Sequence, residues 1–266
     1  MERLRNKKGF ICDMDGVIYH GNLLLPGVVE FVGWLEEHEK NYVFLTNSSE
    51  RSPRELQMKL QRLGLSVGEG HFYTSALATA SFLASQHPGG SAYVIGEAGL
   101  VGALYDRGFS MNDVNPDYVV VGETSAYSYE RILRAVKLVR NGAKLIGTNP
   151  DLTGPIENGI APATRALIAP IEMACGVTAY FVGKPNPLIM RHALKQLGTD
   201  PNESAIIGDR MDTDIIAGIE SEIDTVLVLS GVTSEKSIGK YPYRPDYVLG
   251  GVGDICSVNS ENTGDG

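Results

Sequence analysis

Cysteine is scarce in this 266-residue sequence, and its three cysteines stand far apart, at Cys12, Cys175 and Cys256. No C-x-x-C pair occurs, so the spacing gives no indication of a zinc site. An odd and scattered set also provides no disulfide framework of the kind that small secreted domains use. We therefore expect free thiols in a reducing compartment.

Positive charge is also in short supply. The sequence has 23 Lys and Arg against 32 Asp and Glu, which gives a net charge of −9. Because no stripe of Lys and Arg is available to displace counterions from a phosphate backbone, nucleic acid is excluded as a partner. An acidic protein can still bind one small phosphate, provided that a metal ion and one or two cations neutralise the site locally.

Long apolar runs are missing as well. The basic residues 1–8 lead into an apolar run before Asp13 that is too short for a signal peptide or a membrane helix. We therefore expect a cytoplasmic protein with no membrane partner. Hydrophobic residues at 43% and charged residues at 21% are typical of a soluble globular chain with one large domain or two modest ones.

Short apolar runs alternate with amphipathic stretches, which predicts a parallel sheet covered by helices. The strands are expected at residues 9–12, 42–45, 92–95, 118–121, 144–146, 179–182, 204–207 and 225–229. The helices are expected near residues 27–39, 53–63, 98–107, 128–141, 162–175, 187–197 and 212–220. In open parallel sheets ligands bind where the strands end.

Two of these strand ends carry acids. Asp13 and Asp15 follow the first strand, and Gly16 allows the backbone to turn sharply after them. Two carboxylates at positions i and i+2 leave an extended segment on the same side, so the pair is expected to bind a cation or share a proton. Taken alone, this pattern is also typical of a surface turn or a calcium-type loop. Three acids, Asp209, Asp212 and Asp214, follow a later strand; they are too many for capping alone and suit Mg²⁺.

The other two strand ends carry neutral donors and a cation. Thr46 and Asn47 can cradle phosphate oxygens, although an N-cap of the next helix explains them equally well. Lys184 offers a point charge for a phosphate or a carboxylate pair, or is an ordinary solvated loop lysine. All four signals follow buried strands in order, and together they provide a nucleophile, a phosphate cradle, a cation and metal ligands.

This set resembles the haloacid dehalogenase (HAD) superfamily of phosphohydrolases, in which D-x-D-G, a Thr or Ser, a Lys and G-D-x-x-x-x-D follow successive strands. Here those motifs fall at Asp13, Asp15, Thr46, Lys184, Asp209 and Asp214. The sequence around these motifs, together with the turn Thr148-Asn149-Pro150-Asp151, is similar to the NagD-like (nitrophenylphosphatase-like, class IIA) branch over residues 9–255.

The resemblance implies an α/β fold with a Rossmann-like, doubly wound parallel-sheet core at residues 1–80 and 181–266. Residues 81–180 would form an inserted, smaller α/β cap domain. Where relatives have P-G-x-G at the entry to a cap helix, this chain has Pro162-Ala163-Thr164-Arg165. That departure leaves open whether Arg165 contacts the leaving group. By analogy, pairing of cap surfaces would make a homodimer.

The resemblance also assigns roles. Asp13 would be the nucleophile that forms an aspartyl-phosphate, and Asp15 the general acid and base. Mg²⁺ would be held by Asp13, the backbone carbonyl of Asp15 and Asp209, while Asp214 supports the metal through waters or orients Lys184. Asp212 is expected to be a surface or helix-start acid. The substrate and its phosphate would contact Gly16, Thr46, Asn47, Asn149 and Lys184.

The expected activity is hydrolysis of small phosphate monoesters, such as nucleotides or sugar phosphates. Asn149 and Asp151 would contact the leaving group or simply stabilise an Asn-Pro turn. A phosphotransferase or mutase on the same scaffold stays open. A receiver-like phospho-accepting switch is the third alternative, but Asp15 opposes it because a built-in base would shorten the life of a signalling aspartyl-phosphate.

Overall fold

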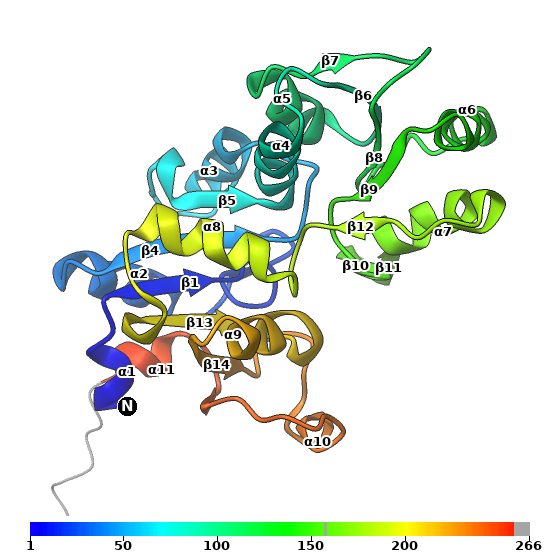
Figure 1. Ribbon diagram of the computed structural model, residues 1–266. Helices are drawn as coiled ribbons and strands as arrows, with labels where there is room; N and C mark the ends of the chain where they lie inside the picture. Colours follow the sequence, from blue (N-terminus) through cyan, green and yellow to red (C-terminus); the bar gives the residue numbers. More distant parts are fainter. Residues whose placement is uncertain (157–158, 258–266) are drawn as a thin grey trace, which may run out of the picture. The chain divides into compact units, whose positions relative to one another are not determined.

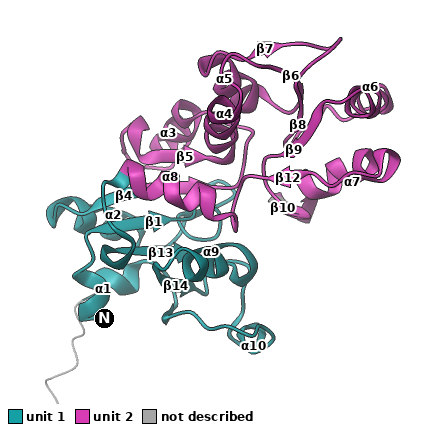
Figure 2. Cartoon of the chain, in the orientation of Figure 1, with its two compact units in different colours: residues 1–42, 197–266 teal, residues 43–196 magenta. Residues whose placement is uncertain are grey.

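The structure is a computed structural model, which describes residues 1–156 and 159–257. The chain divides by its internal contacts into two compact units, which Figure 2 shows in different colours. Unit 1 comprises residues 1–42 and 197–266, of which 258–266 lie outside the described residues, and unit 2 comprises residues 43–196. The chain leaves unit 1 within strand β4 (Asn41–Thr46) and returns at the end of helix α8 (Pro187–Leu197).

Unit 1 is built on a parallel sheet (Figure 1). Its strands lie in the order β15 (Tyr247–Leu249), β14 (Asp224–Val228), β13 (Ser204–Gly208) and β1 (Gly9–Cys12). Every residue of β1 and β13 is buried, as expected for parallel strands that are covered on both faces. The predicted strands at 9–12 and 204–207 are therefore confirmed, whereas β15 escaped prediction.

Helix α2 (Val28–Glu37) shows why the helices of unit 1 form where they do. Val28, Phe31, Val32 and Leu35 recur at helical spacing, and all four are buried. Each such side chain contributes about 2 kcal/mol when it leaves water. The other elements of unit 1 are α1 (Glu2–Arg5), the hairpin β2 (Tyr19–His20) and β3 (Leu23–Leu24), η2 (Pro201–Glu203), η3 (Met211–Ile215), α9 (Ile216–Glu220), α10 (Glu235–Ile238) and α11 (Gly253–Cys256).

Unit 2 begins with β4, which pairs in parallel with β5 (Phe72–Thr74). Helix α3 (Pro53–Arg62) lies between them in sequence, and Ser52 and Glu55 form a capping box at its start. The predicted strand at 42–45 and helix at 53–63 are confirmed, while the three-residue β5 was missed. The remaining elements of this part are η1 (Glu69–His71), α4 (Ser75–Gln86) and α8.

A second parallel sheet occupies the rest of unit 2. Its strands lie in the order β12 (Tyr180–Phe181), β9 (Lys144–Gly147), β8 (Tyr118–Val121), β6 (Ser91–Ile95) and β7 (Ser110–Met111). The helices of this region are α5 (Ala98–Asp106), α6 (Tyr129–Arg140) and α7 (Thr164–Cys175). The structure also has an antiparallel hairpin of β10 (Thr153–Ile156) and β11 (Gly159–Pro162), which was not predicted.

The second sheet has an apolar core of its own. Side chains of β8, such as Val119 and Val121, pack with Leu138 of α6 and Ile168 and Ile171 of α7. The strands of this sheet fall within residues 91–181, close to the inserted stretch that the sequence predicts. The cap boundaries at 81 and 180 remain a prediction, because the contacts group residues 43–196 as one unit.

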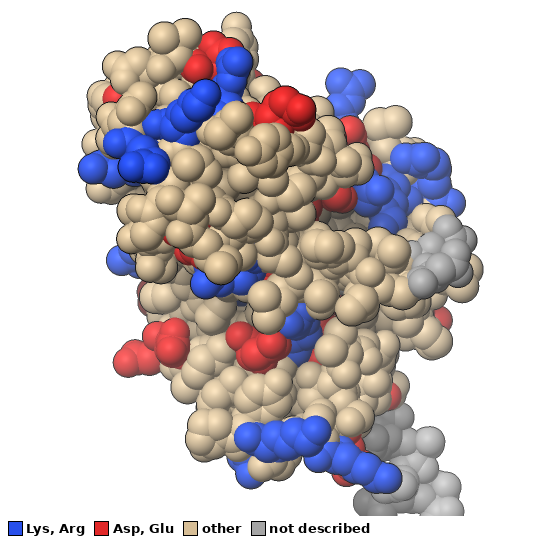
Figure 3. Space-filling view, turned by 90° about the vertical axis from the view of Figure 1, so that its right-hand side faces the viewer, with Lys and Arg blue, Asp and Glu red and all other residues tan. Residues whose placement is uncertain are grey.

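The charged side chains, the helices and the cysteines can each be compared with what the composition of the chain predicts. On the face shown in Figure 3, the described Lys and Arg side chains form small groups interspersed with Asp and Glu. Within residues 1–156 and 159–257, no helix combines the length and hydropathy that crossing a bilayer requires. All three cysteines are free, as expected, and burial raises the pKa of the Cys12 thiol well above its ordinary value.

Candidate active site

Three of the predicted acids meet at one edge of the unit 1 sheet. Asp13 follows β1, Asp209 follows β13, and Asp214 lies in η3, which leads into α9. A carboxylate oxygen of each lies within 4.8 Å of the others. Because β1 and β13 are parallel neighbours, their carboxyl ends bring these loops together. Asp209 and Asp214 are buried, whereas Asp13 is partly exposed.

Carboxylates at this separation repel one another strongly. At 4.8 Å, the upper limit of these separations, and an effective dielectric constant of about 20, the repulsion of two ionised carboxylates costs about 3.5 kcal/mol. A divalent cation offsets that repulsion, and Mg²⁺ favours a few carboxylate oxygens with water and phosphate oxygens at its other positions. The cluster fits Mg²⁺ because it offers hard oxygen atoms and because one of its members, Asp13, is not fully buried.

A loop after β14 holds Asp209 in place. The backbone N–H of Val232 donates to Asp209 Oδ2 at 2.6 Å, and the N–H of Thr233 donates to the Asp209 carbonyl oxygen at 3.1 Å. A Cβ at Gly231 would lie 2.0 Å from Asp209 Oδ2, and one at Gly16, where φ is +78°, would lie 2.6 Å from it. Both glycines therefore make room for the Asp209 carboxylate.

Asp214 is held from its own loop. The backbone N–H of Arg210 donates to Asp214 Oδ2 at 3.1 Å, and a Cβ at Gly208 would lie only 2.1 Å from the Asp214 Cβ. Asp212, by contrast, is exposed and accepts two hydrogen bonds from the Arg210 guanidinium, at 3.1 and 3.0 Å. Asp212 is thus a surface acid, as predicted.

Asp15 lies on a tight turn that follows Asp13. The N–H of Ile18 donates to the Met14 carbonyl at 2.9 Å, and the N–H of Gly16 donates to the Tyr19 carbonyl at 2.8 Å. Met14 is fully buried, while Asp13 and Asp15 on either side of it are partly exposed. The alternation leaves both carboxylates on the side of the chain away from the core.

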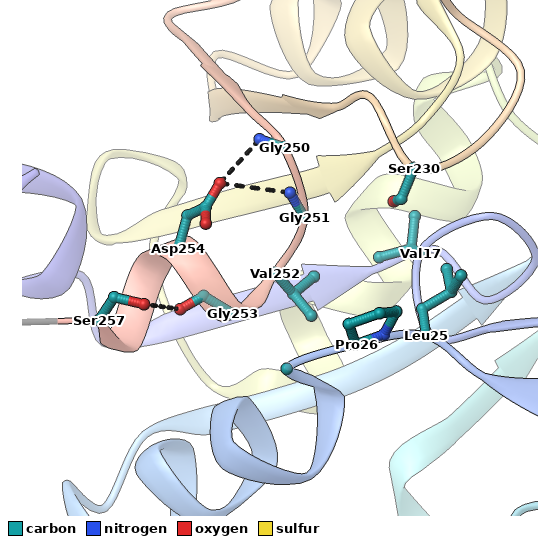
Figure 4. A pocket seen from close by; sticks show the side chains of 11 residues that line it. Val17, Leu25, Pro26, Ser230, Gly250, Gly251, Val252, Gly253, Asp254 and Ser257 are labelled. Carbon is teal, nitrogen blue, oxygen red and sulfur yellow. Dashed lines mark hydrogen bonds between the residues drawn. The ribbon is translucent and has the colours of Figure 1, made fainter.

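A hollow of about 470 Å³ lies elsewhere in unit 1 (Figure 4). Val17 of the turn after Asp15 and Ser230 of the loop after β14 line it, together with the Gly250–Gly253 segment. Among the described residues that line it, Asp254 is the acid, and it accepts hydrogen bonds from the N–H groups of Gly250 and Gly251, at 2.7 and 3.4 Å. The acid cluster does not line this hollow.

Unit 2 brings the predicted phosphate-binding residues together. The Lys184 N–H donates to Asn47 Oδ1 at 2.8 Å, and Asn47 Nδ2 donates to the Lys184 carbonyl at 3.0 Å. The Lys184 side chain is 2% exposed, and its Nζ donates to the Leu45 carbonyl at 3.4 Å. Thr46 Oγ1 accepts from the N–H of Ser48 at 3.1 Å. The ends of β4 and β12 are therefore tied through one amide side chain.

Asn149 and Asp151 join the same network. Asn149 is fully buried, and its Nδ2 donates to the Asn47 carbonyl at 2.7 Å and to Glu123 Oε1 at 2.8 Å. Asn149 Oδ1 accepts from the Asp151 N–H at 3.1 Å, and Asp151 Oδ2 accepts from Asn47 Nδ2 at 3.0 Å. The amide of Asn149 is thus engaged with neighbouring loops of the protein.

Arg165, at the departure from the common glycine-rich segment, pairs with the Glu172 carboxylate of the same helix. Its guanidinium also lies over the Phe181 ring, 5.2 Å from the ring centroid. These contacts hold the side chain along α7 and against β12.

Family comparisons bear on both units. The family model described as haloacid dehalogenase-like hydrolase matches residues 10–110, and a second HAD-like hydrolase model matches residues 181–255. A dihydroxyacetone phosphatase of Corynebacterium glutamicum is 43% identical over 257 residues, which cover 97% of this chain and 94% of that protein. The chain belongs to the HAD superfamily. It is a phosphoric monoester hydrolase.

Two further relatives place this HAD hydrolase in the NagD-like branch. The ribonucleotide monophosphatase NagD of Escherichia coli K12 is 42% identical over 93% of this chain and 98% of its own, and its solved structure superposes with a TM-score of 0.89. A 4-nitrophenylphosphatase from Thermotoga maritima has a TM-score of 0.92 at 32% identity, and 96% of this chain and 98% of that chain are covered. The HAD-like α/β core with a cap domain is thus confirmed.

Sequence reasoning about this HAD hydrolase missed three residues that shape the site. Gly231 contacts Asp209, and its signal was a glycine two residues past an apolar strand. Ser49 and Glu123 tie the loop after β4 to the turn that contains Asn149. The sequence around Glu123 does not reveal its hydrogen-bond partners, because Ser49 and Asn149 lie far away along the chain.

Proposed function

We propose that this HAD hydrolase is an Mg²⁺-dependent phosphatase of small phosphate monoesters that works through an aspartyl-phosphate on Asp13. The observation that carries the proposal is the cluster of Asp13, Asp209 and Asp214 carboxylates within 4.8 Å of one another. The relatives are named for dihydroxyacetone, ribonucleotide and acid sugar phosphatase activities. The variety of these names supports a small phosphorylated metabolite as substrate. Selection among leaving groups would then depend on the cap domain.

In the first step a carboxylate oxygen of Asp13 attacks phosphorus, and the bond from phosphorus to the ester oxygen breaks. Asp15, protonated at the start, gives its proton to the departing ester oxygen, so that an alcohol leaves. The position of Asp15 two residues from Asp13, on the same side of a tight turn, supports this division of labour.

In the second step the Asp15 carboxylate removes a proton from water. The water oxygen attacks phosphorus, the bond from phosphorus to Asp13 breaks, and inorganic phosphate leaves. Asp13 returns to the carboxylate form and Asp15 to the protonated form, which closes the cycle.

Mg²⁺ would be held by the carboxylates of Asp13 and Asp209 and the backbone carbonyl of Asp15, with Asp214 in support. When bound, the ion offsets the negative charge that builds on the transferring phosphoryl group. Thr46, Asn47 and the Gly16 turn would donate to phosphate oxygens, and Lys184 would balance their charge. The hydrogen bonds that join Asn47 to Lys184 support a shared role for these two residues.

Steady-state release of phosphate from p-nitrophenyl phosphate tests this proposal. Asp13→Asn removes the attacking oxygen while keeping the shape of the side chain, so we expect kcat to fall by at least about 10³-fold. Chelation with EDTA should stop the wild type, and added Mg²⁺ should restore it. Asp212→Asn is the matched control and should keep at least half of the activity.

Retained turnover in Asp13→Asn would remove the proposed nucleophile. Full activity in excess EDTA would remove the metal. Transfer of phosphate to an added alcohol faster than to water would instead indicate a phosphotransferase.

A further inference from the structure

Glu123 is a carboxylate held entirely by neutral donors. Its Oε2 accepts from the Ser49 N–H and from Ser49 Oγ, each at 3.0 Å, and its Oε1 accepts from Asn149 Nδ2 at 2.8 Å. Across the described part of the chain, no ion pair joins a basic side chain to this carboxylate. Glu123 follows Gly122 at the end of β8, so it comes from a different sheet than the loop it binds.

Such a carboxylate needs its hydrogen bonds. Burial, followed by repulsion from Glu50, raises the pKa of Glu123, while the bonds from Ser49 and Asn149 act in the opposite direction. Both of its oxygens are acceptors in the ionised form. In a protonated carboxyl or a Gln side chain, one of the two groups would be a donor. That donor would face another donor, either the Ser49 N–H or the Asn149 side-chain amide. The hydrogen bonds therefore favour the anion and partly offset the burial that raises the pKa.

Both partners of Glu123 are linked to Asn47, Ser49 through the chain and Asn149 through a hydrogen bond. Ser49 is two residues after Asn47 in the loop that follows β4. Asn149 Nδ2 donates to Glu123 and also to the Asn47 carbonyl at 2.7 Å. The Asn47 side chain in turn exchanges two hydrogen bonds with the Lys184 backbone. Hydrogen bonds thus connect the Glu123 carboxylate through Asn149 and Asn47 to the Lys184 backbone.

We propose that Glu123 is a positioning residue for phosphate binding, which holds the loop of Thr46 to Ser49 so that Thr46, Asn47 and Lys184 present their donors to the phosphoryl group. The inference rests on the proposed function of that loop. Glu123 touches no reacting atom and acts through Ser49 and Asn149. Its loss weakens binding of phosphate in the ground state more than it slows the chemistry at Asp13.

Inhibition by inorganic phosphate tests the role, with p-nitrophenyl phosphate as substrate and Mg²⁺ present. For Glu123→Gln we expect the Ki of phosphate and the KM to rise about tenfold, with a fall in kcat of less than about threefold. Glu97→Gln is the matched control. Glu97 also accepts hydrogen bonds from neutral groups of unit 2, Thr124 Oγ1 at 2.7 Å and the Ser125 N–H at 3.1 Å, but not from the loop after β4. Its Ki should stay within twofold of the wild type.

A Ki in Glu123→Gln equal to that in Glu97→Gln would overturn the inference while leaving the phosphatase proposal intact. An inactive wild type would overturn the phosphatase proposal itself, which separates the two failures. If Glu123→Gln does not fold, Ser49→Ala takes its place, because it deletes one donor to Glu123 and keeps the carboxylate. We expect Ser49→Ala to raise the Ki at least threefold, and an unchanged Ki would contradict the role.

Discussion

Asp209 and Glu123 are carboxylates in opposite surroundings. Asp209 lies among other acids and is held by backbone N–H groups of the loop after β14, which suits a metal ligand. Glu123 lies among neutral donors and binds two loops together. Asp209 was predictable because three acids after one strand are too many for capping. Glu123 was not, because its partners at positions 49 and 149 are invisible in the local sequence.

The raised pKa of Glu123 predicts a pH dependence of stability that the Gln variant lacks. Since the folded-state pKa lies above the ordinary 4.5, the folded protein binds more protons than the unfolded chain in the interval between the two values. The stability due to this group is therefore complete below about pH 4.5 and is lost as the pH rises through the folded-state pKa. Thermal denaturation of both proteins measures this effect. The difference in Tm, wild type minus Glu123→Gln, should decrease as the pH rises through this interval.

Glu97→Gln provides the comparison, because hydrogen bonds from Thr124 and Ser125 lower the pKa of Glu97. A difference in Tm between wild type and Glu123→Gln that is constant from pH 4 to pH 8 would contradict the direction assigned to Glu123.

Among the elements, the strands that end in functional residues were the most predictable. The continuous apolar runs of β1, β4 and β13 identify buried strands, and polar residues mark where each one ends. β5, β15 and the hairpin of β10 and β11 were missed, because runs of three or four residues are too short to carry a periodic signal. Their positions depend on contacts that are distant in the sequence.

The loop after β14 carries a prediction of its own. In Gly231→Ala the new Cβ would meet Asp209 Oδ2 at 2.0 Å, so either the loop or the carboxylate must move. We expect the Mg²⁺ concentration for half-maximal activity to rise at least about tenfold. Gly239→Ala is the matched control in the same unit, because a Cβ there has nothing within 4 Å and its φ of −61° suits alanine.

Titration of phosphatase activity with Mg²⁺ measures both variants. Equal Mg²⁺ requirements in Gly231→Ala and Gly239→Ala would show that the loop does not set the position of Asp209.

At the scale of the whole molecule, the family and the α/β core with its cap were predictable, because four motifs in fixed order determine them together. The extent of the cap was not, since the contacts place residues 43–196 in one unit while the motif order suggests 81–180. The predicted site residues fall into two sets, with the acids in unit 1 and Thr46, Asn47, Asn149 and Lys184 in unit 2. The acids cluster within unit 1, and Asn47, Asn149 and Lys184 of the second set are linked by hydrogen bonds within unit 2.

In the proposed mechanism Asp13 and Asp209 hold one divalent cation, with Asp214 in support. Isothermal titration calorimetry of Mg²⁺ into the metal-free protein tests it most directly, with Asp209→Asn compared with Asp212→Asn. We expect one site in the wild type, at least about tenfold weaker affinity in Asp209→Asn, and wild-type affinity in Asp212→Asn. Equal Mg²⁺ affinity in the wild type and Asp209→Asn would contradict the account.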